Sequence, residues 1–216
     1  MRDHIHFFRQ FRSRFKTTGA VAPSSRFLAN AMTGPLQQHR GPARILEAGP
    51  GTGAVTRSIV KLLKPEDRLD LVELNESFVQ LLERRFETDA LYKRAAGQSQ
   101  IHVCPLQDFE PDGRYDFIIS GLPLNNFSAD SVRDIFDAYF RLLAPGGVLS
   151  YFEYMYVRPM RKLVSSGQEK ERIDALDEIM GEHLDRHRFR TSWVFVNFPP
   201  AWVQHLQYEP KTDHPH

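Results

Sequence analysis

The sequence predicts one α/β domain with a mostly parallel sheet that binds a nucleoside-containing ligand. Residues 43–46 form an apolar run, residues 47–53 a glycine-rich turn, and residues 55–63 an amphipathic stretch. This order indicates a strand, a tight turn and a helix whose N-terminus favours negative charge. Twenty residues after the turn, a second apolar run ends at Glu73, where a carboxylate can accept both ribose hydroxyls.

The first element expected along the chain is a helix over residues 4–16. Its aromatic residues recur at steps of three and four, and its other side is basic. This pattern is typical of a helix that lies on a membrane surface, with Phe8, Phe11, Arg12 and Phe15 as the binding residues. It fits equally well a helix that packs its aromatic side against the domain, so both interpretations stay open.

The next segment joins this helix to the core. Residues 18–25 read as a loop, and Ser24 or Ser25 can cap a helix over residues 26–32. Gly-Pro pairs at 34–35 and 41–42 then interrupt the chain before the first core strand. We therefore expect residues 1–33 to form an N-terminal helical extension.

The core is expected to alternate strands and helices, as in α/β folds. The apolar patterns predict strands at 43–48, 68–73, 100–104, 115–120, 148–154, 190–197 and 201–206. They predict helices at 54–64, 76–87, 130–143 and 168–185. The 216 residues are thus expected to form a single domain with its core at 43–206, and the tail 209–216 is expected to be disordered.

Composition narrows the class of protein. The net charge of +1 predicts no partner, although residues 1–16 carry five cations against one carboxylate. The single cysteine, Cys104, excludes an internal disulfide and reads as a small apolar residue on a strand. No apolar run is long enough to span a bilayer, and no secretory signal is recognisable, so a cytoplasmic protein is expected.

Two cofactors compete for the glycine-rich turn. Its spacing Gly49-x-Gly51-x-x-Ala54 satisfies the dinucleotide fingerprint. With Glu47 leading, the same segment resembles motif I of class I S-adenosylmethionine (SAM) methyltransferases. Residues 107–109 stand where that family places the acid that reads the adenine amine, and residues 120–124 stand where it places its catalytic motif.

The resemblance implies a Rossmann-like SAM methyltransferase fold, with a seven-stranded, mostly parallel sheet covered by helices on both faces. It implies SAM as cofactor and S-adenosylhomocysteine (SAH) as product, with Glu73 on the ribose and Asp108 on the adenine amine. It also implies that the loop over residues 18–25 forms a lid on the cofactor site. The expected cofactor-binding residues are Glu47, Gly49, Gly51, Thr52, Gly53, Glu73, Leu74, Asp108, Phe109 and Ser120. The alternative is a Rossmann-type domain that binds a nucleotide for another purpose.

The expected catalytic turn is Ser120, Gly121, Leu122 and Pro123. Many nucleic-acid amine methyltransferases carry an acid or amide at the start of this turn and an aromatic residue after its proline. Here Ser120-Gly121 and Leu124 replace them, so the turn departs from the pattern that suits a flipped base. The Leu-Pro corner is kept, and its carbonyls could orient an amine.

Three blocks carry a closer resemblance. TGAVAPSS at residues 18–25, SGLPLNNF at 120–127 and NFPPAW at 197–202 are similar to bacterial phospholipid N-methyltransferases of the branch related to rRNA dimethylases. This resemblance implies methylation of phosphatidylethanolamine toward phosphatidylcholine. Alternatives are an ornithine-lipid N-methyltransferase, an RNA adenine methyltransferase, and a non-catalytic SAM-binding or membrane-binding module.

The lipid hypothesis assigns further residues and partners. Tyr151 and Tyr154 could contact a quaternary ammonium through their aromatic faces, and Arg158 could bind the phosphate. The expected partners are an anionic membrane surface and an amino-phospholipid, with no nucleic acid and no metal. The protein is then expected to bind peripherally to the inner face of the membrane.

Overall fold

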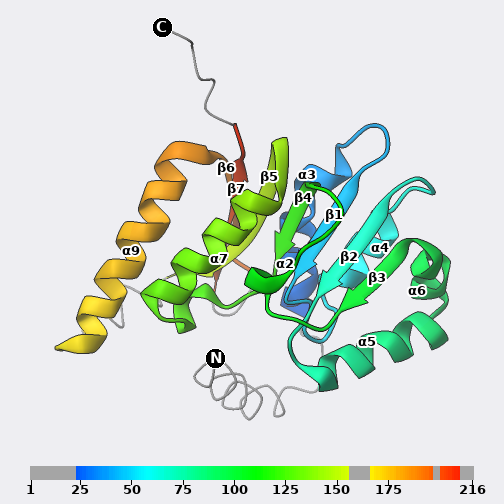
Figure 1. The fold of residues 1–216 in the computed structure, drawn as a ribbon, viewed down its shortest axis with the longest axis horizontal. Coiled ribbons are helices and arrows are strands. Elements are labelled where there is room, and N and C mark those ends of the chain that lie inside the picture. The colour runs from blue at the N-terminus through cyan, green and yellow to red at the C-terminus, as the bar shows by residue number, and fades with distance from the viewer. Residues whose placement is uncertain (1–22, 156–165, 197–199, 210–216) are drawn as a thin grey trace, which may run out of the picture.

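The computed structural model describes residues 23–155, 166–196 and 200–209 (Figure 1). Several predictions fall outside these residues: the helix over 4–16, most of the loop 18–25, the segment around Arg158, and the end of the tail. The membrane-binding residues that were predicted there are Phe8, Phe11, Arg12 and Phe15.

All seven described strands belong to one sheet, with the order β3-β2-β1-β4-β5-β7-β6. The strands are β1 (Arg44–Ala48), β2 (Arg68–Val72), β3 (Ser99–His102), β4 (Tyr115–Ser120), β5 (Leu143–Tyr154), β6 (Arg188–Val194) and β7 (Ala201–Gln207). Strand β7 runs antiparallel to its two neighbours, and the other pairings are parallel. The predicted seven-stranded, mostly parallel sheet is confirmed.

Helices cover both faces of the sheet (Figure 1). They are α2 (Pro23–Met32), α3 (Gly34–Gln37), α4 (Thr56–Leu62), α5 (Glu76–Thr88), α6 (Ala90–Ala95), α7 (Ala129–Leu142) and α9 (Gln168–His187). Helices α7 and α9 bury their apolar sides in one core, where Phe136, Tyr139 and Leu176 lie. Helices α2, α4 and α6 contribute to the second core on the opposite face, with Met32, Ile59 and Tyr92.

The element boundaries differ from the sequence-based expectation in a few places. Helix α2 begins at Pro23, so Ser24 and Ser25 lie within it and the predicted capping position is wrong. Proline favours the first turn of a helix because its missing N–H would be unpaired there anyway. Strand β5 begins at Leu143 and includes the Pro-Gly-Gly segment, with an irregular register against β4. Strand β3 ends at His102, so Cys104 follows the strand.

The sheet order places one feature at its centre. Strand β1 pairs with β2 on one side and with β4 on the other, so the order reverses between β1 and β4. Loops that leave adjacent strands in opposite directions open a crevice at such a point, outside the C-terminal ends of the strands. Among the described residues, no helix is long and apolar enough to cross a membrane.

Candidate functional site

The loop after β1 meets the loop after β4 in very close contact. The Gly121 N–H donates to the Ala48 carbonyl at 2.8 Å, which joins these two loops. The Gly49 N–H donates to the Val72 carbonyl of β2 at 2.9 Å, on the other side of β1. A Cβ atom at Gly121 would lie 2.6 Å from the carbonyl oxygen of Gly49. Gly49 itself has φ +69°, which L side chains rarely adopt. The two backbones therefore approach each other because neither residue has a side chain.

The middle of the glycine loop faces open space. Gly51 has φ +54°, and no atom lies within 4 Å of the position that its Cβ would occupy. Its N–H donates to Glu73 Oε2 at 3.0 Å, while the Asn75 N–H donates to Glu73 Oε1 at 2.8 Å. The Glu73 carboxylate is thus held by two backbone donors, and each oxygen keeps a lone pair that can accept a further hydrogen bond. Burial raises the pKa of Glu73, and these backbone donors partly offset that rise.

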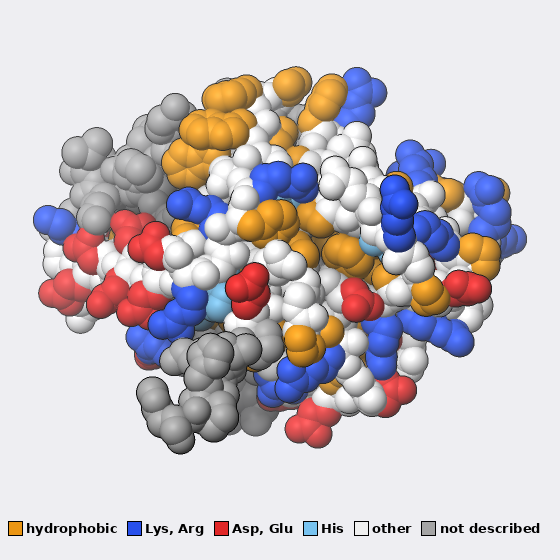
Figure 2. Space-filling view, turned by 90° about the horizontal axis from the view of Figure 1, so that it is seen from above, with side chains coloured by type: hydrophobic (Ala, Val, Ile, Leu, Met, Phe, Trp, Pro, Cys, Tyr) orange, Lys and Arg blue, Asp and Glu red, His pale blue; other side chains and the backbone are white. Residues whose placement is uncertain are grey.

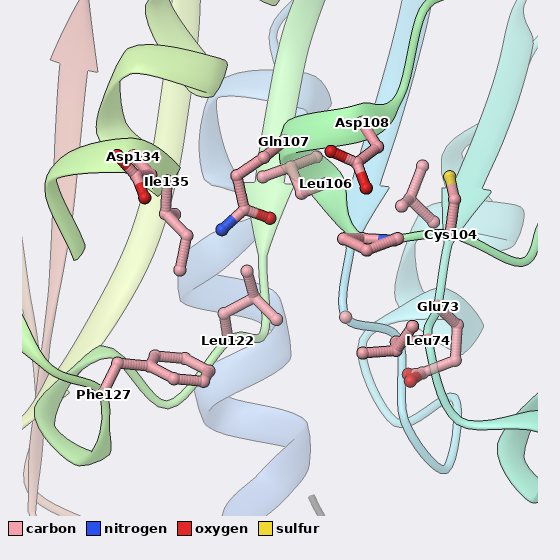
Figure 3. Close-up of a pocket in the computed structure, with 13 residues that line it drawn as sticks. Glu73, Leu74, Cys104, Leu106, Gln107, Asp108, Leu122, Phe127, Asp134 and Ile135 are labelled. Atoms are coloured by element: carbon pink, nitrogen blue, oxygen red, sulfur yellow. The ribbon is translucent and has the colours of Figure 1, made fainter. Parts of the chain in front are cut away.

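A cavity of about 500 Å³ opens beside this carboxylate (Figure 3). It lies at the C-terminal ends of the strands, where the loops after β1, β2, β3 and β4 meet the start of α7. Its lining consists of Gly49, Val72, Glu73, Leu74, Cys104, Pro105, Leu106, Gln107, Asp108, Leu122, Phe127, Asp134 and Ile135. A cavity of this volume can accommodate a nucleoside or a small ligand.

The two ends of the cavity differ in chemistry (Figure 3). Glu73, Leu74 and Asp108 lie together on one side, where a carboxylate, an apolar wall and a second carboxylate suit a ribose and a base. On the other side, the exposed Asp134 lies beside Ile135 on α7, and Phe127 lines the lower part of the same side. That side combines one carboxylate with apolar walls, which suits a cationic group attached to an apolar molecule.

Several lining residues were not predicted as site residues. They are Val72, Cys104, Pro105, Leu106, Gln107, Phe127, Asp134 and Ile135. Cys104 was interpreted as a strand residue, but it follows β3 and borders the cavity, and burial raises the pKa of its thiol. Residues 104–107 directly follow a parallel strand, and this position in the sequence could have identified them as site residues. No such signal marks Asp134, which lies one turn into a helix.

Glu47 lies beneath the glycine loop and is 1% exposed. Burial raises its pKa to about 8, and contact with Thr56 partly offsets the rise. Neither carboxylate oxygen makes a hydrogen bond of standard geometry within the described residues. A buried acid without hydrogen-bond partners favours its protonated form unless a cation or a donor reaches it.

The predicted catalytic turn, residues 120–123, is held by hydrogen bonds of the buried Ser120 side chain. The buried Ser120 hydroxyl is hydrogen-bonded to the Tyr139 hydroxyl, and Ser120 Oγ accepts from the Leu122 N–H at 3.2 Å. Gly121 packs on the glycine loop, while Leu122 lines the cavity and Pro123 precedes the short 3-10 helix Leu124–Asn126. The Ser120 side chain therefore shapes the turn from within the core.

Three predicted site residues lie elsewhere. Phe109 is buried and packs against His102, with ring centroids 4.7 Å apart. Tyr151 is fully buried beneath α7, and Tyr154 packs against Phe152, the ring centroids being 5.2 Å apart. None of the three lines the cavity.

The remaining predicted positions occupy the glycine loop and its surroundings. Thr52 is half-buried in this loop, and the carbonyl of Gly53 accepts a 2.9 Å hydrogen bond from the buried Tyr92 hydroxyl. Asp108 is exposed at the cavity rim. Within the described ranges, no cluster of three or more His, Cys, Asp or Glu side chains is placed to hold a metal ion.

Comparison with known proteins agrees with this geometry. Residues 45–147 match the family described as "Methyltransferase domain". An ornithine lipid N-methyltransferase of Singulisphaera acidiphila is 28% identical over 155 residues, which cover 72% of this chain and 80% of that protein.

Solved structures show the same fold. The N-methyltransferase NodS of Bradyrhizobium japonicum WM9, in complex with SAH, superposes with a TM-score of 0.64 at 18% identity, over 87% of this chain and 89% of that chain. The SAM-bound O-methyltransferase TomG of Streptomyces achromogenes gives a TM-score of 0.60 at 17% identity, over 88% and 81% of the two chains. Residues 45–147 are thus similar to a methyltransferase domain, and the chain has the Rossmann-like fold of these methyltransferases.

Proposed function

We propose that the protein transfers methyl groups from SAM to the amine of a membrane lipid, and that an ornithine lipid is the acceptor. The observation that carries this proposal is the relationship to the ornithine lipid N-methyltransferase, which extends over 72% of the chain. The sequence resemblance to phospholipid N-methyltransferases favours phosphatidylethanolamine instead. The two acceptors share a primary amine close to an anionic group and attached to acyl chains.

The cavity fits the cofactor. Glu73 is held by two backbone donors in a position to accept from ribose hydroxyls, and the open space at Gly51 leaves room for the ligand. Asp108 and Leu74 line the same side and are assigned to the adenine. Glu47, which has no standard hydrogen bond, is assigned to the amino group of the cofactor. Bound SAM supplies a methyl group on a positively charged sulfur, which makes that methyl electrophilic.

The other side of the cavity is assigned to the acceptor amine. The Asp134 carboxylate attracts the protonated headgroup to the cavity, where Phe127 and Ile135 surround it with apolar surface. The amine must lose a proton to solvent before its nitrogen can attack. The apolar surface of Phe127 and Ile135 lowers the pKa of the amine and favours this loss, whereas the Asp134 carboxylate favours the protonated form that first enters the cavity. The chain's contribution is then mainly to align the nitrogen with the methyl group, through Leu122 and the turn that Ser120 holds.

Activity assays with labelled SAM test this proposal. Detergent micelles would contain ornithine lipid, phosphatidylethanolamine or no lipid, and RNA would be tested separately. We expect label in the ornithine lipid, with mass spectrometry showing N-methylated product. Label in phosphatidylethanolamine alone would show that this lipid, and not ornithine lipid, is the acceptor. Label in RNA alone would refute a lipid substrate.

A variant pair on α7 tests the acceptor side. Asp134→Asn should raise the KM for the lipid while the affinity for SAH stays unchanged. Asp137→Asn is the matched control, because Asp137 is exposed on the same helix and does not line the cavity. Equal effects of the two substitutions would contradict a role for Asp134 in binding the amine.

A further inference from the structure

Exposed apolar side chains are concentrated at one edge of the sheet. Six large hydrophobic residues are exposed in the described part of the chain, and all but Val103 lie on β6, directly after it, or on α2. We call these five the edge patch: Phe27, Phe189, Trp193, Phe195 and Val196. Their exposed fractions range from 39% at Phe27 to 66% at Val196. Scattered exposed hydrophobics are ordinary, whereas exposed aromatic rings that contact each other, as Trp193 and Phe195 do, indicate an interaction surface.

The edge patch is built on the last strand of the sheet. Strand β6 pairs only with β7 among the described strands, so its other side has no strand partner. The rings of Trp193 and Phe195 stack with centroids 5.7 Å apart, and Trp193 meets Trp202 edge-on at 5.8 Å. Helix α2, which carries Phe27, packs against β6. Trp193 and Phe195 are thus held by each other and by Trp202 of β7.

This surface reaches the end of the sheet where the cavity opens. Strands β5 and β6 are both antiparallel to β7, so β6 runs parallel to β5 and to the other parallel strands. Trp193 lies one residue before the end of β6, and Phe195 and Val196 follow that end. They therefore lie at the C-terminal end of the parallel strands, as do the loops that form the cavity.

The segments that carry the edge patch have charges of one sign, while the acidic helix α9 packs against β6 on the other side of the sheet from α2. Arg26 lies over the Phe27 ring at 4.9 Å, and Arg190 lies 5.9 Å from the centre of the Phe189 ring. Residues 23–38 and 188–196 contain no Asp or Glu. Figure 2 shows hydrophobic side chains gathered along its upper border with Lys and Arg beside them, whereas acidic side chains concentrate at the left, where Figure 1 places α9. The edge patch is therefore apolar and cationic.

We propose that the edge patch docks the protein on an anionic lipid bilayer, with Trp193 and Phe195 inserted at the headgroup level. The inference rests on the proposed function, since it identifies the surface through which the cavity reaches a lipid acceptor. Tryptophan suits this level because its ring is apolar and its N–H is polar. Nearby cations add attraction to anionic headgroups. A second copy of the chain fits less well, because a symmetric contact places the same cations opposite each other with no carboxylate in these segments to balance them.

Vesicle sedimentation of the full chain tests the proposal. The probes are phosphatidylglycerol vesicles and phosphatidylcholine vesicles at low and high salt. We expect the double variant Trp193→Ser/Phe195→Ser to bind phosphatidylglycerol vesicles about tenfold more weakly or worse, since burial of one aromatic side chain contributes that much. Val103→Ser is the matched control, because Val103 is 55% exposed but follows β3 at the opposite edge. Unchanged SAH affinity shows that each variant is folded.

The outcomes separate the inference from the proposed function. Equal vesicle binding by the double variant and the parent would overturn the edge patch as a membrane surface. A parent that is dimeric, with a double variant that is monomeric, would overturn it in favour of contact between copies. A third outcome would support the edge patch as a membrane surface. In that outcome both proteins methylate a short-chain, water-soluble ornithine lipid, but only the double variant loses activity on ornithine lipid in vesicles. Failure of the parent on every lipid, despite vesicle binding, would refute the proposed function and leave the docking surface in place.

Discussion

Replacing Glu47 by glutamine should change how stability depends on pH. Burial raises the pKa of Glu47 from 4.5 to about 8. Because the folded pKa is above the unfolded one, the folded state binds more protons between these two values. The free energy of unfolding therefore falls as pH rises from about 4.5 to about 8, and this loss is complete above the folded pKa.

The magnitude follows from the pKa shift. Each pKa unit corresponds to about 1.4 kcal/mol, so the whole shift sets a ceiling of about 5 kcal/mol. We expect about 2–3 kcal/mol, because relaxation and water penetration reduce the cost of a buried charge in real proteins. Glutamine does not ionise, so the Glu47→Gln protein lacks this loss.

Urea denaturation of both proteins at pH 5, 6, 7 and 8 provides the measurement. The buried amide has its own cost, which is the same at every pH, so the readout is the change with pH in the stability difference between variant and wild type. Glu87→Gln, at an exposed position of α5, is the control and should leave the pH dependence unchanged. A difference between Glu47→Gln and wild type that stays constant from pH 5 to 8 would refute the buried-acid argument.

The same residue predicts a proton linkage to cofactor binding. If the amino group of the cofactor reaches Glu47, as proposed, the cation lowers the pKa of this carboxyl. Binding of SAH at pH 7 should then release protons, which calorimetry detects as a dependence of the binding enthalpy on the buffer. The Glu47→Gln protein should release fewer protons. Equal proton release from both proteins would show that Glu47 does not contact the amino group of the cofactor.

Three other substitutions test the frame of the site. Gly121→Ala should greatly weaken SAH binding and lower stability, since its Cβ would lie 2.6 Å from the Gly49 carbonyl oxygen; unchanged melting and SAH affinity would contradict this contact. Glu73→Gln should weaken SAH binding by about tenfold or more in calorimetry, because one carboxylate oxygen becomes an NH2 donor that faces the N–H of Gly51 or that of Asn75. Tyr92→Phe removes the hydroxyl that donates to the glycine loop and should lower the free energy of unfolding by about 1 kcal/mol in urea, with a parallel loss of SAH affinity. A loss of stability without any loss of affinity would limit this tyrosine to a role in packing.

Local patterns in the sequence were sufficient for the strand–turn–helix unit at the centre of the fold. The glycine turn after β1 and the acid at the end of β2 are determined by neighbours in the chain, and Glu73 indeed lies against Gly51. Strand periodicity likewise identified the sheet, since alternation of apolar residues depends on the local backbone. Helix α6 and the start of α2 were missed or misplaced, because short helices carry little periodic signal.

The walls of the cavity depended on contacts between distant segments. The sequence itself offered Asp108 and Phe109 together, but only Asp108 reaches the rim while Phe109 turns into the core. No pattern in the sequence marks Asp134 as a site residue, because it reaches the cavity only when α7 packs beside the loop after β3. Sequence periodicity assigns a residue to a face of its own element, but it does not say what the neighbouring element is.

What the sequence determined by itself, then, is the α/β class, the glycine loop and the paired acid, since each follows from residues close together in the chain. Only the tertiary structure decided that β6 is an edge strand, that Trp193 and Phe195 are exposed at its end, and that Gly49 and Gly121 touch across the reversal in strand order. The physical reason is that strand order and packing are set by the burial of whole faces, a property of the assembled sheet that no single segment encodes.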